Sequence, residues 1–381
     1  MKAIYWRPRG ISPTALVLVA VLALMGLAAV ELFQRKVKQP NYLEKLHASR
    51  LAREAFDVIK AERLRRGLAI DPETDPAQSG LIGELMTSVT SNTGVLRAKQ
   101  TTVNPNFAAV LVNYFKKVGC EEGDVVAVGL SGSFPALNIC VYAAIQTLKL
   151  KPIIISSGSA SQWGANVPQL LWIDMEQVLY DRRLFSFRSI AASVGGIEDK
   201  GLGMSDEGIA LIRRTIAGDQ LPLLQPSSYT DSINQRMKLF REQAGDRPIK
   251  IYVNVGGGTT SVGTIIGKRQ FKPGLNYRAP QRGPEIDSIM HRFVEEGVPV
   301  VHLTKIEELA GRFGLPVMPT TIPVVGEGKI FKREQYNPWL TAGVLLGILI
   351  ALYAFIRSDW GFRMQLSARR RHNAEHPEPM V

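Results

Sequence analysis

The chain has 381 residues, of which 46 are lysine or arginine and 34 are aspartate or glutamate, so its formal net charge is +12. Such a basic balance attracts anionic partners, although a solvated basic face without a partner is the common alternative. The two cysteines, Cys120 and Cys140, are expected at opposite ends of a strand–helix unit, which disfavours a disulfide, and we interpret both as small buried residues. No metal-ligand spacing is present, and we expect no metal, no cofactor and no nucleic-acid partner.

Two apolar runs near the ends of the chain are each long enough to cross a membrane, which requires about 20 apolar residues in a helix. The first, residues 11–33, contains Glu31 as its only acid, and the second, residues 339–356, contains no charge. A cleaved signal peptide is the alternative for the first run, but the run exceeds a signal core and no clear small-x-small cleavage site precedes its basic flank. Core burial is the alternative for the second run, whose uniform apolarity leaves no polar face for water. We expect both runs to span.

Basic residues outside the two runs predict that both termini are cytoplasmic. The tail carries five arginines, and the N-terminus carries Lys2, Arg7 and Arg9. The flank after the first run is also basic, but a connecting segment of some 300 residues translocates largely regardless of its charge. We therefore expect a two-pass protein of the inner or plasma membrane with an extracytoplasmic main domain, on which +8 of the net charge lies.

These expectations divide the chain into seven segments. They are a cytoplasmic N-terminus (1–10), a transmembrane helix (11–33), a stalk helix and linker (34–76), the extracytoplasmic α/β domain (77–320), a linker (321–338), a transmembrane helix (339–356) and a basic cytoplasmic tail (357–381). In the third segment, Asn41 with Glu44 is expected to cap a helix with one apolar face that ends before Gly67. We interpret this helix as a stalk or a packing arm.

Strands and helices alternate along the rest of the middle region. A helical stretch at 81–89 precedes a helix that begins at Asn104 and Pro105 and stops at Gly119. The later elements are a strand at 124–130, a helix at 135–148 capped by Ser133, a strand at 152–156, helices at 168–180, 205–217 and 228–244, a strand at 249–255, a helix at 284–296, a strand at 298–303, and a helix with a capping box of Thr304 and Glu307 that ends near Gly314. This alternation predicts a layered, doubly wound α/β domain with a mostly parallel sheet.

Three loops after predicted strands are rich in glycine and hydroxyl groups, at 129–133, 156–164 and 254–263. Ligands of parallel sheets bind outside the carboxyl ends of the strands, and free N–H and hydroxyl groups suit phosphate, carboxylate or sugar ligands. The expected anion- or polymer-binding residues in these loops are Ser131, Gly132, Ser133, Ser157, Ser159, Asn254, Gly256, Gly257, Gly258, Thr259 and Thr260. Ordinary turns and caps are the alternative.

A basic stretch surrounds the third loop. Residues 247–284 contain seven basic residues and no acid before Glu285. The members expected to take part in binding are Lys268, Arg269, Lys272, Arg278 and Arg282. They are predicted either to draw a polyanion toward the cleft or to contact anionic lipid headgroups.

Two enzymatic interpretations stay open. The segment NVGGGTTS faintly resembles the phosphate loop of actin-like ATPases, but Asn254 stands where their acid would hold magnesium, and no GxxxxGK[ST] pattern is present. A serine hydrolase would use Ser131 or Ser133 as nucleophile, and Ser131, Asp174 and His302 follow the chain order of α/β-hydrolases. However, GLSGS lacks the final glycine of G-x-S-x-G, and a lone histidine is more often a core or surface residue.

The order of VAVGLSGSFPALN, IISSGSASQWGAN, WIDME and YVNVGGGTTSVG between two terminal apolar runs resembles the poly-gamma-glutamate system protein family. The resemblance covers most of the chain. It implies a membrane accessory protein of poly-gamma-glutamate capsule synthesis or export, with the acidic polymer, the membrane subunits of the synthase and membrane lipid as partners. It supplies no catalytic residues that could be carried over.

We therefore expect a non-ligase accessory subunit that receives, guides or retains the acidic polymer outside the cytoplasm. One alternative is an exported serine hydrolase or transferase that trims or attaches the polymer. Another is a structural scaffold whose two spans hold synthase subunits together.

Overall fold

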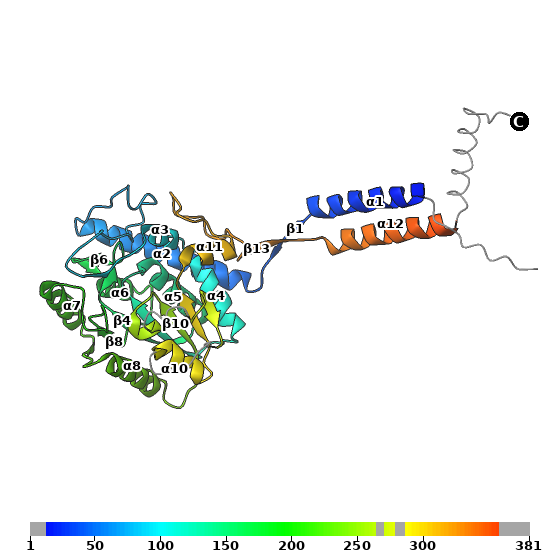
Figure 1. Cartoon of the computed structure of the whole chain (residues 1–381). Helices are drawn as coiled ribbons and strands as arrows, with labels where there is room; N and C mark the ends of the chain where they lie inside the picture. Colours follow the sequence, from blue (N-terminus) through cyan, green and yellow to red (C-terminus); the bar gives the residue numbers. More distant parts are fainter. Residues whose placement is uncertain (1–12, 264–269, 279–285, 358–381) are drawn as a thin grey trace, which may run out of the picture. The chain divides into compact units, whose positions relative to one another are not determined.

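The computed structural model describes residues 13–263, 270–278 and 286–357, and the chain forms two compact units. One unit combines the two ends of the chain, up to Lys38 and from Arg333 onward. The other runs from Gln39 to Lys332 and contains the α/β fold (Figure 1).

Helices and strands alternate in the larger unit. Its helices are α2 (Tyr42–Arg65), α3 (Leu96–Thr102), α4 (Phe107–Lys117), α5 (Pro135–Leu148), α6 (Trp172–Asp181), α7 (Asp206–Gly218), α8 (Tyr229–Ala244), α9 (Thr259–Val262), α10 (Ile289–Glu295) and α11 (Ile306–Phe313). Its strands are β2 (Thr90–Asn92), β3 (Val125–Ser131), β4 (Lys151–Ser157), β5 (Ala160–Ser161), β6 (Asn166–Val167), β7 (Leu170–Leu171), β8 (Ala191–Ser193), β9 (Leu223–Leu224), β10 (Ile249–Val255), β11 (Gly274–Asn276) and β12 (Val300–Leu303).

Seven strands form one sheet in the order β11–β12–β10–β3–β4–β8–β9, and every neighbouring pair is parallel except β11 with β12. β3 lies near the centre because its run of buried apolar residues suits a strand that is covered on both faces. After β3 the chain proceeds outward through β4, β8 and β9, and it then returns with β10 to the other side of β3. The strand order therefore reverses between β3 and β10. The predicted mixed α/β class with a mostly parallel sheet is confirmed.

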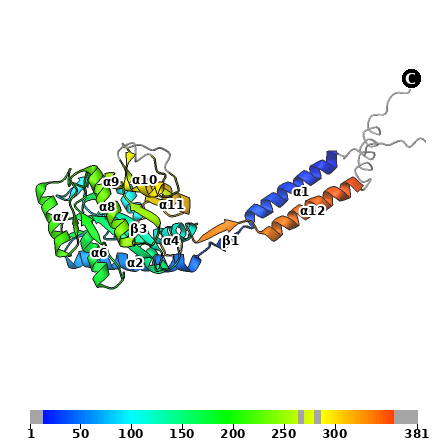
Figure 2. The same ribbon diagram turned by 90° about the horizontal axis from the view of Figure 1, so that it is seen from below.

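Helices cover both faces of this sheet. Alternate residues of β3 point to opposite faces, so Val126 and Val128 belong to one hydrophobic cluster and Val125 and Ala127 to another. The first cluster joins the sheet to α2, α4, α5 and α6, and the second joins it to α8 and α10. Figure 2 shows α2 and α6 on one side of the sheet and α8 and α10 on the other. Two packed layers of helices thus fix the sheet from both sides.

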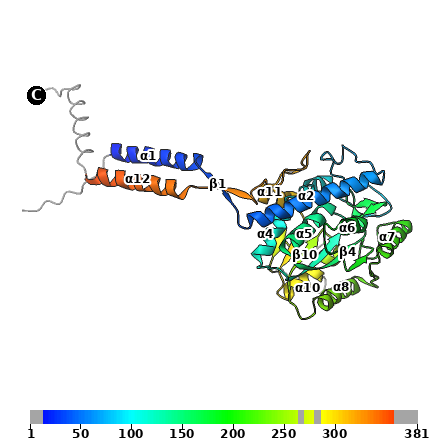
Figure 3. The ribbon, with the colours of Figure 1, turned by 180° about the vertical axis from the view of Figure 1, so that it is seen from behind.

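α2 belongs to the α/β unit, which changes the predicted boundary between the stalk and the domain. Its residues Ala48, Ala52, Ala55 and Phe56 are fully buried, because α2 packs against α4 and α5 (Figure 3). Small side chains on one helix face allow such close packing. The compact unit therefore starts at Gln39 rather than near residue 77.

Several predicted local features differ from the structure. No helix forms at 81–89, where bends lead into β2. Asn41 adopts a left-handed conformation without a capping hydrogen bond. Ser133 does not cap α5, because its Oγ accepts the N–H of Ser161 instead. The capping box before α11 is also absent, since Lys305 is the residue that precedes the first helical turn.

Other predictions agree closely with the structure. β10 has the predicted bounds, 249–255, and α7 and α8 begin after Ser205 and Ser228, whose side chains accept N–H groups of the first turn. Cys120 and Cys140 are buried and free. Long periodic elements and the cysteines were thus predictable.

The smaller unit contains a helix pair and a short two-stranded sheet. α1 (Pro13–Leu32) packs beside α12 (Pro338–Arg357), and β1 (Arg35–Lys38) pairs with β13 (Lys332–Gln335). Gly26 allows the close helix approach, because a Cβ at this position would lie 2.4 Å from Cγ1 of Val344. Within the described residues, one helix, Pro338–Phe355, is long and apolar enough to cross a membrane, and the apolar helix Leu16–Leu32 is shorter than that. The two-span prediction therefore stays a prediction.

Candidate functional site

A cavity of about 1020 Å³ lies at the carboxyl edge of the sheet, where the strand order reverses between β3 and β10. The loops after β3, β4 and β10 line it, together with residues between β2 and α3 and at the start of α11. In open parallel sheets this switch point is the usual ligand position, because the connections on its two sides diverge. The three hydroxyl-rich loops therefore meet around one space.

Most of the residues expected to bind an anion line this cavity. They are Ser131, Ser133, Ser157, Ser159, Asn254, Gly257, Gly258, Thr259 and Thr260. Gly132 and Gly256 lie in the same loops without lining the cavity, and their N–H groups donate to the carbonyl oxygens of Ser159 and Leu303. These two backbone bonds tie the loops to neighbouring segments.

The basic stretch that was expected to draw a polyanion does not line the cavity where the structure describes it. Lys272 and Arg278 are exposed and do not belong to the lining. Lys268, Arg269 and Arg282 lie outside the described residues. Charge inside the cavity comes from residues that the sequence did not indicate.

The most unusual of these residues is Lys99 in α3. Its side chain is 2% exposed, and its Nζ donates to the carbonyl oxygen of Ser133 and, at 2.7 Å, to Oγ of Ser161. Nζ also lies 3.9 Å from the centre of the Phe134 ring. Burial lowers the pKa of Lys99 to about 7. No ion pair joins it to a carboxylate of the described chain, so a buried amine faces the cavity without a counter-charge.

A second cation in the lining is fully compensated. Arg236 from α8 pairs with Asp199 at 2.8 Å, and each side chain is 4% exposed. Asp199 also accepts hydrogen bonds from Oγ of Ser193 and of Ser232, at 2.5 and 2.8 Å. Such a paired and hydrogen-bonded arrangement keeps both charges in place. The charge of Arg236 is already compensated within the protein, so an anionic ligand would stabilise Arg236 less than Lys99.

The start of α11 adds three charged residues to the lining, Lys305, Glu307 and Glu308. Glu307 pairs with Arg97 at 3.5 Å, and Glu308 pairs with Arg312 at 2.9 Å. Cations and carboxylates thus occur in equal number in the lining. The cavity is suited to a few charged groups rather than to a dense polyanion.

The predicted Ser131–His302–Asp174 triad is not assembled. Oγ of Ser131 donates to the carbonyl oxygen of Val255 at 3.3 Å, and Nδ1 of His302 lies 3.1 Å from the amide nitrogen of Asn254. Burial lowers the pKa of His302 to about 4, so this ring is neutral and acts as part of the core. Asp174 accepts a backbone N–H at the start of α6 and lies outside the cavity lining. The described hydrogen bonds therefore do not join Ser131, His302 and Asp174 into the predicted triad.

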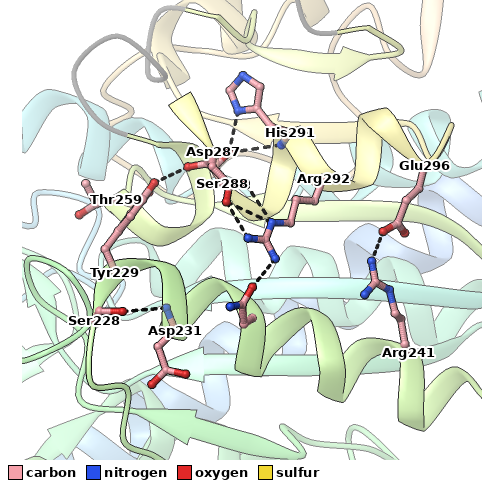
Figure 4. A network of polar contacts seen from close by, with 11 residues as sticks. Ser228, Tyr229, Asp231, Arg241, Thr259, Asp287, Ser288, His291, Arg292 and Glu296 are labelled. Atoms are coloured by element: carbon pink, nitrogen blue, oxygen red, sulfur yellow. Dashed lines mark hydrogen bonds and ion pairs between the residues drawn. The ribbon is translucent and has the colours of Figure 1, made fainter. Parts of the chain in front are cut away.

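The glycine-rich loop after β10 is held from behind by α8 and α10. Figure 4 shows Tyr229 at the start of α8, whose hydroxyl donates to the carbonyl oxygen of Asp287 and lies 3.4 Å from that of Thr259. The Asp287 carboxylate in turn pairs with Arg292 of α10 at 2.6 Å. The loop residues that line the cavity are thus anchored to two helices, which limits their freedom before a ligand binds.

The part of the chain that the structure describes holds no group of three His, Cys, Asp or Glu residues that could bind a metal ion. No protein-family model and no curated protein matches the chain. Among solved structures, an archaeal alanine:glyoxylate aminotransferase has 11% sequence identity over 92% of this chain and 69% of its own, with a TM-score of 0.16. A likeness at that level carries no functional argument.

The burial of Lys99 predicts an unusual dependence of stability on pH. The folded pKa of about 7 lies below the ordinary lysine value of 10.5, so the unfolded chain binds more protons between these values. The free energy of unfolding therefore rises with pH across this window, by at most about 1.4 kcal/mol per pH unit, and the gain is absent below pH 7. Burial also lowers the pKa of Lys45, to about 8, so Lys45 adds a slope of the same sign above pH 8. We therefore expect Lys99→Met to make the slope shallower, by the contribution of Lys99, in chemical unfolding of the full chain in detergent.

The matched control is Lys151→Met, which removes an exposed lysine at the start of β4. It should keep the slope of the unaltered protein. If the free energies of unfolding of the unaltered protein and of Lys99→Met change with pH in parallel, the pKa of Lys99 is not lowered in the folded protein.

Proposed function

We propose that the larger unit binds a ligand through a carboxylate that pairs with Lys99 in the cavity between β3 and β10. The observation that carries this proposal is the burial of Lys99, 2% exposed in the cavity lining and without a carboxylate partner in the described chain. Burying a cation without a counter-charge costs free energy, and an entering carboxylate offsets that cost. Because Lys99 has no carboxylate partner in the described chain, the cavity favours an anionic ligand.

The hydroxyl groups around Lys99 support the same ligand chemistry. Ser133 and Ser161 are lining residues whose O–H groups can donate to carboxylate oxygens. Hydrogen bonds to an ionised acceptor are stronger than those to a neutral one, at roughly 1.5–3 kcal/mol each. A carboxylate that reaches Lys99 thus gains several donors at once.

The resemblance to poly-gamma-glutamate system proteins supports a specific ligand, because that polymer carries a carboxylate on every residue. A cavity of about 1020 Å³ is at the upper end of small-molecule sites, which hold roughly 300–1,000 Å³. It therefore suits one end or a short segment of the polymer. The acidic residues Glu307 and Glu308 at the start of α11 disfavour a groove that follows a long polyanion.

We further propose that α1 and α12 anchor this unit at the outer face of the membrane, beside the membrane subunits of a synthase. The length and apolarity of Pro338–Phe355 support the second span, and the packing of α1 against α12 supports a shared role for the two helices. In this position the protein receives or retains an end of the acidic polymer. A scaffold without a ligand is the alternative, and it requires no affinity for glutamyl oligomers.

The binding proposal predicts that a short γ-linked glutamate oligomer binds the full chain in zwitterionic nanodiscs, measured by calorimetry. Lys99→Met should weaken binding about 10- to 100-fold, as expected for one hydrogen-bonded charge. The bound carboxylate raises the pKa of Lys99 above its free value of about 7, so the complex retains a proton that the free protein loses. Affinity should therefore fall by up to about tenfold per pH unit above pH 7.

The other charged groups of the lining are the same in both proteins, so the difference between them isolates Lys99. These groups are Asp199, Arg236, Lys305, Glu307 and Glu308. Lys272→Met is the matched control, because Lys272 is an exposed lysine outside the lining. If Lys272→Met weakens binding and Lys99→Met does not, the ligand binds at the basic stretch and not in the cavity, and the proposal is contradicted.

The topology proposal predicts that a cysteine introduced at Lys272 reacts with a membrane-impermeant maleimide in intact cells. Native Cys120 and Cys140 are buried, so they give little background in the folded protein. A cysteine in place of Arg369 should react only after the cells are permeabilised. Reversal of the two labelling patterns would place the α/β unit in the cytoplasm.

A further inference from the structure

We propose that Ser161 and Lys99 form a nucleophile–base pair that cleaves or transfers the acyl group of a carboxylate-bearing amide or ester in this cavity. This inference rests on the proposed binding function, since the same cavity must hold the substrate. A carboxylate paired with Lys99 raises its pKa, so the neutral base forms near pH 7 in the free protein and at a higher pH in the complex. It differs from the serine hydrolase predicted from the sequence, which relied on Ser131 or Ser133. Two lining hydroxyl groups contact basic side chains in the described chain: Ser157 contacts the guanidinium of Arg236, and Ser161 contacts the amine of Lys99. Only the amine can lose its proton and act as a base, so Ser161 is the candidate nucleophile.

The geometry of the pair is set by three separate elements. Lys99 comes from α3, and Ser161 ends β5, which pairs with β2 through Thr90 with Ala160 and Asn92 with Ser161. Nζ of Lys99 lies 2.7 Å from Oγ of Ser161, within the range for direct proton transfer. Both residues line the cavity, so the hydroxyl is in contact with the space that a substrate would occupy.

The neighbours of Lys99 leave its Nζ free to exchange a proton with Ser161. The carbonyl oxygen of Ser133 accepts one N–H, and the ring of Phe134 lies 3.9 Å away on another side. A pKa of about 7 leaves a large neutral fraction at neutral pH, and a neutral amine can accept the hydroxyl proton of Ser161. An ordinary lysine, charged at this pH, cannot act as a base.

Ser133 supplies a group that could stabilise developing negative charge. Its Oγ accepts the backbone N–H of Ser161 at 3.1 Å, which fixes it next to the nucleophile. Within the described chain its own hydroxyl proton has no assigned acceptor, so it is available to a substrate oxygen. A donor held beside the attacking oxygen is the arrangement that stabilises a tetrahedral oxyanion.

The reaction balances with water as the only further reactant. The Oγ–H proton moves to Nζ of Lys99 as Oγ bonds to the substrate carbonyl carbon, and the C–N or C–O bond to the leaving group then breaks. The leaving amine or alcohol takes the proton from Lys99. Water attacks the resulting ester, gives a proton through Lys99 to Oγ of Ser161, and releases the acid. An amine that replaces water in the second step gives transfer instead of hydrolysis.

The test uses a fluorophosphonate probe, which reacts covalently with activated serines, on the full chain in nanodiscs, with peptide mapping by mass spectrometry. We expect labelling at Ser161, no label at this site in Ser161→Ala, and labelling at least about 100-fold slower in Lys99→Met, the usual loss when a general base is removed. The labelling rate should rise about tenfold per pH unit up to pH 7 and level off above it, because the neutral form of Lys99 is the active one.

Two further variants separate base catalysis from structure. Lys99→Arg keeps a cation but has no accessible neutral form, so it should bind the glutamate oligomer and lose the labelling. Ser186→Ala removes an exposed serine outside the cavity and should be labelled at the normal rate. Normal labelling of Ser161 in Lys99→Arg, or a labelling rate that does not rise toward pH 7, would show that Lys99 is not the general base for Ser161.

The binding measurement distinguishes failure of this inference from failure of the proposed function. Ser161→Ala should retain the affinity for the oligomer within a few-fold, since Lys99 stays in place. If the unaltered protein binds the oligomer and Ser161 is not labelled, the nucleophile–base pair is wrong and the binding function stands. If Ser161 is labelled and the oligomer does not bind, the pair stands and the carboxylate ligand is wrong.

Discussion

The parallel pairing of β3 with both β4 and β10 is the constraint on which the rest of the structure depends. Val128 is paired with Ile154 on one side and with Val253 on the other, so all three strands end at the same edge of the sheet. Loops that are distant in sequence therefore meet there, and the reversal of strand order leaves space between them. The two hydrophobic layers keep this edge rigid, because alternate residues of each central strand are packed on opposite faces.

Lys99 connects this architecture to the proposed function. A buried cation without a counter-charge lowers the stability of the folded state, and such costs are often found where a ligand or a reaction needs them. The nearby Arg236–Asp199 pair shows the opposite solution, in which the charge is satisfied inside the protein. The contrast explains why the proposed ligand and the proposed chemistry both centre on Lys99, although several other polar groups line the same cavity.

The parts of the fold that the sequence predicted are those with strong local signals. β10 is buried from Ile251 to Val255, and the loop convergence follows from the rule for parallel sheets. Lys99 could not be predicted, because LRAKQTT in α3 has no apolar periodicity and its burial comes from Ser133, Phe134 and Ser161, which are distant in sequence. For the described members of the basic stretch, Lys272 and Arg278, charge density in the sequence did not reveal that their side chains lie outside the cavity lining.

A structure of the full chain in nanodiscs with a short γ-linked glutamate oligomer tests most directly whether the cavity is a carboxylate site organised by Lys99. The result that we predict is a ligand carboxylate within about 3 Å of Nζ of Lys99, in the space between the loops after β3 and β10. An oligomer bound outside the cavity, along the exposed residues near Lys272, or an oligomer whose carboxylates avoid Lys99, would contradict it.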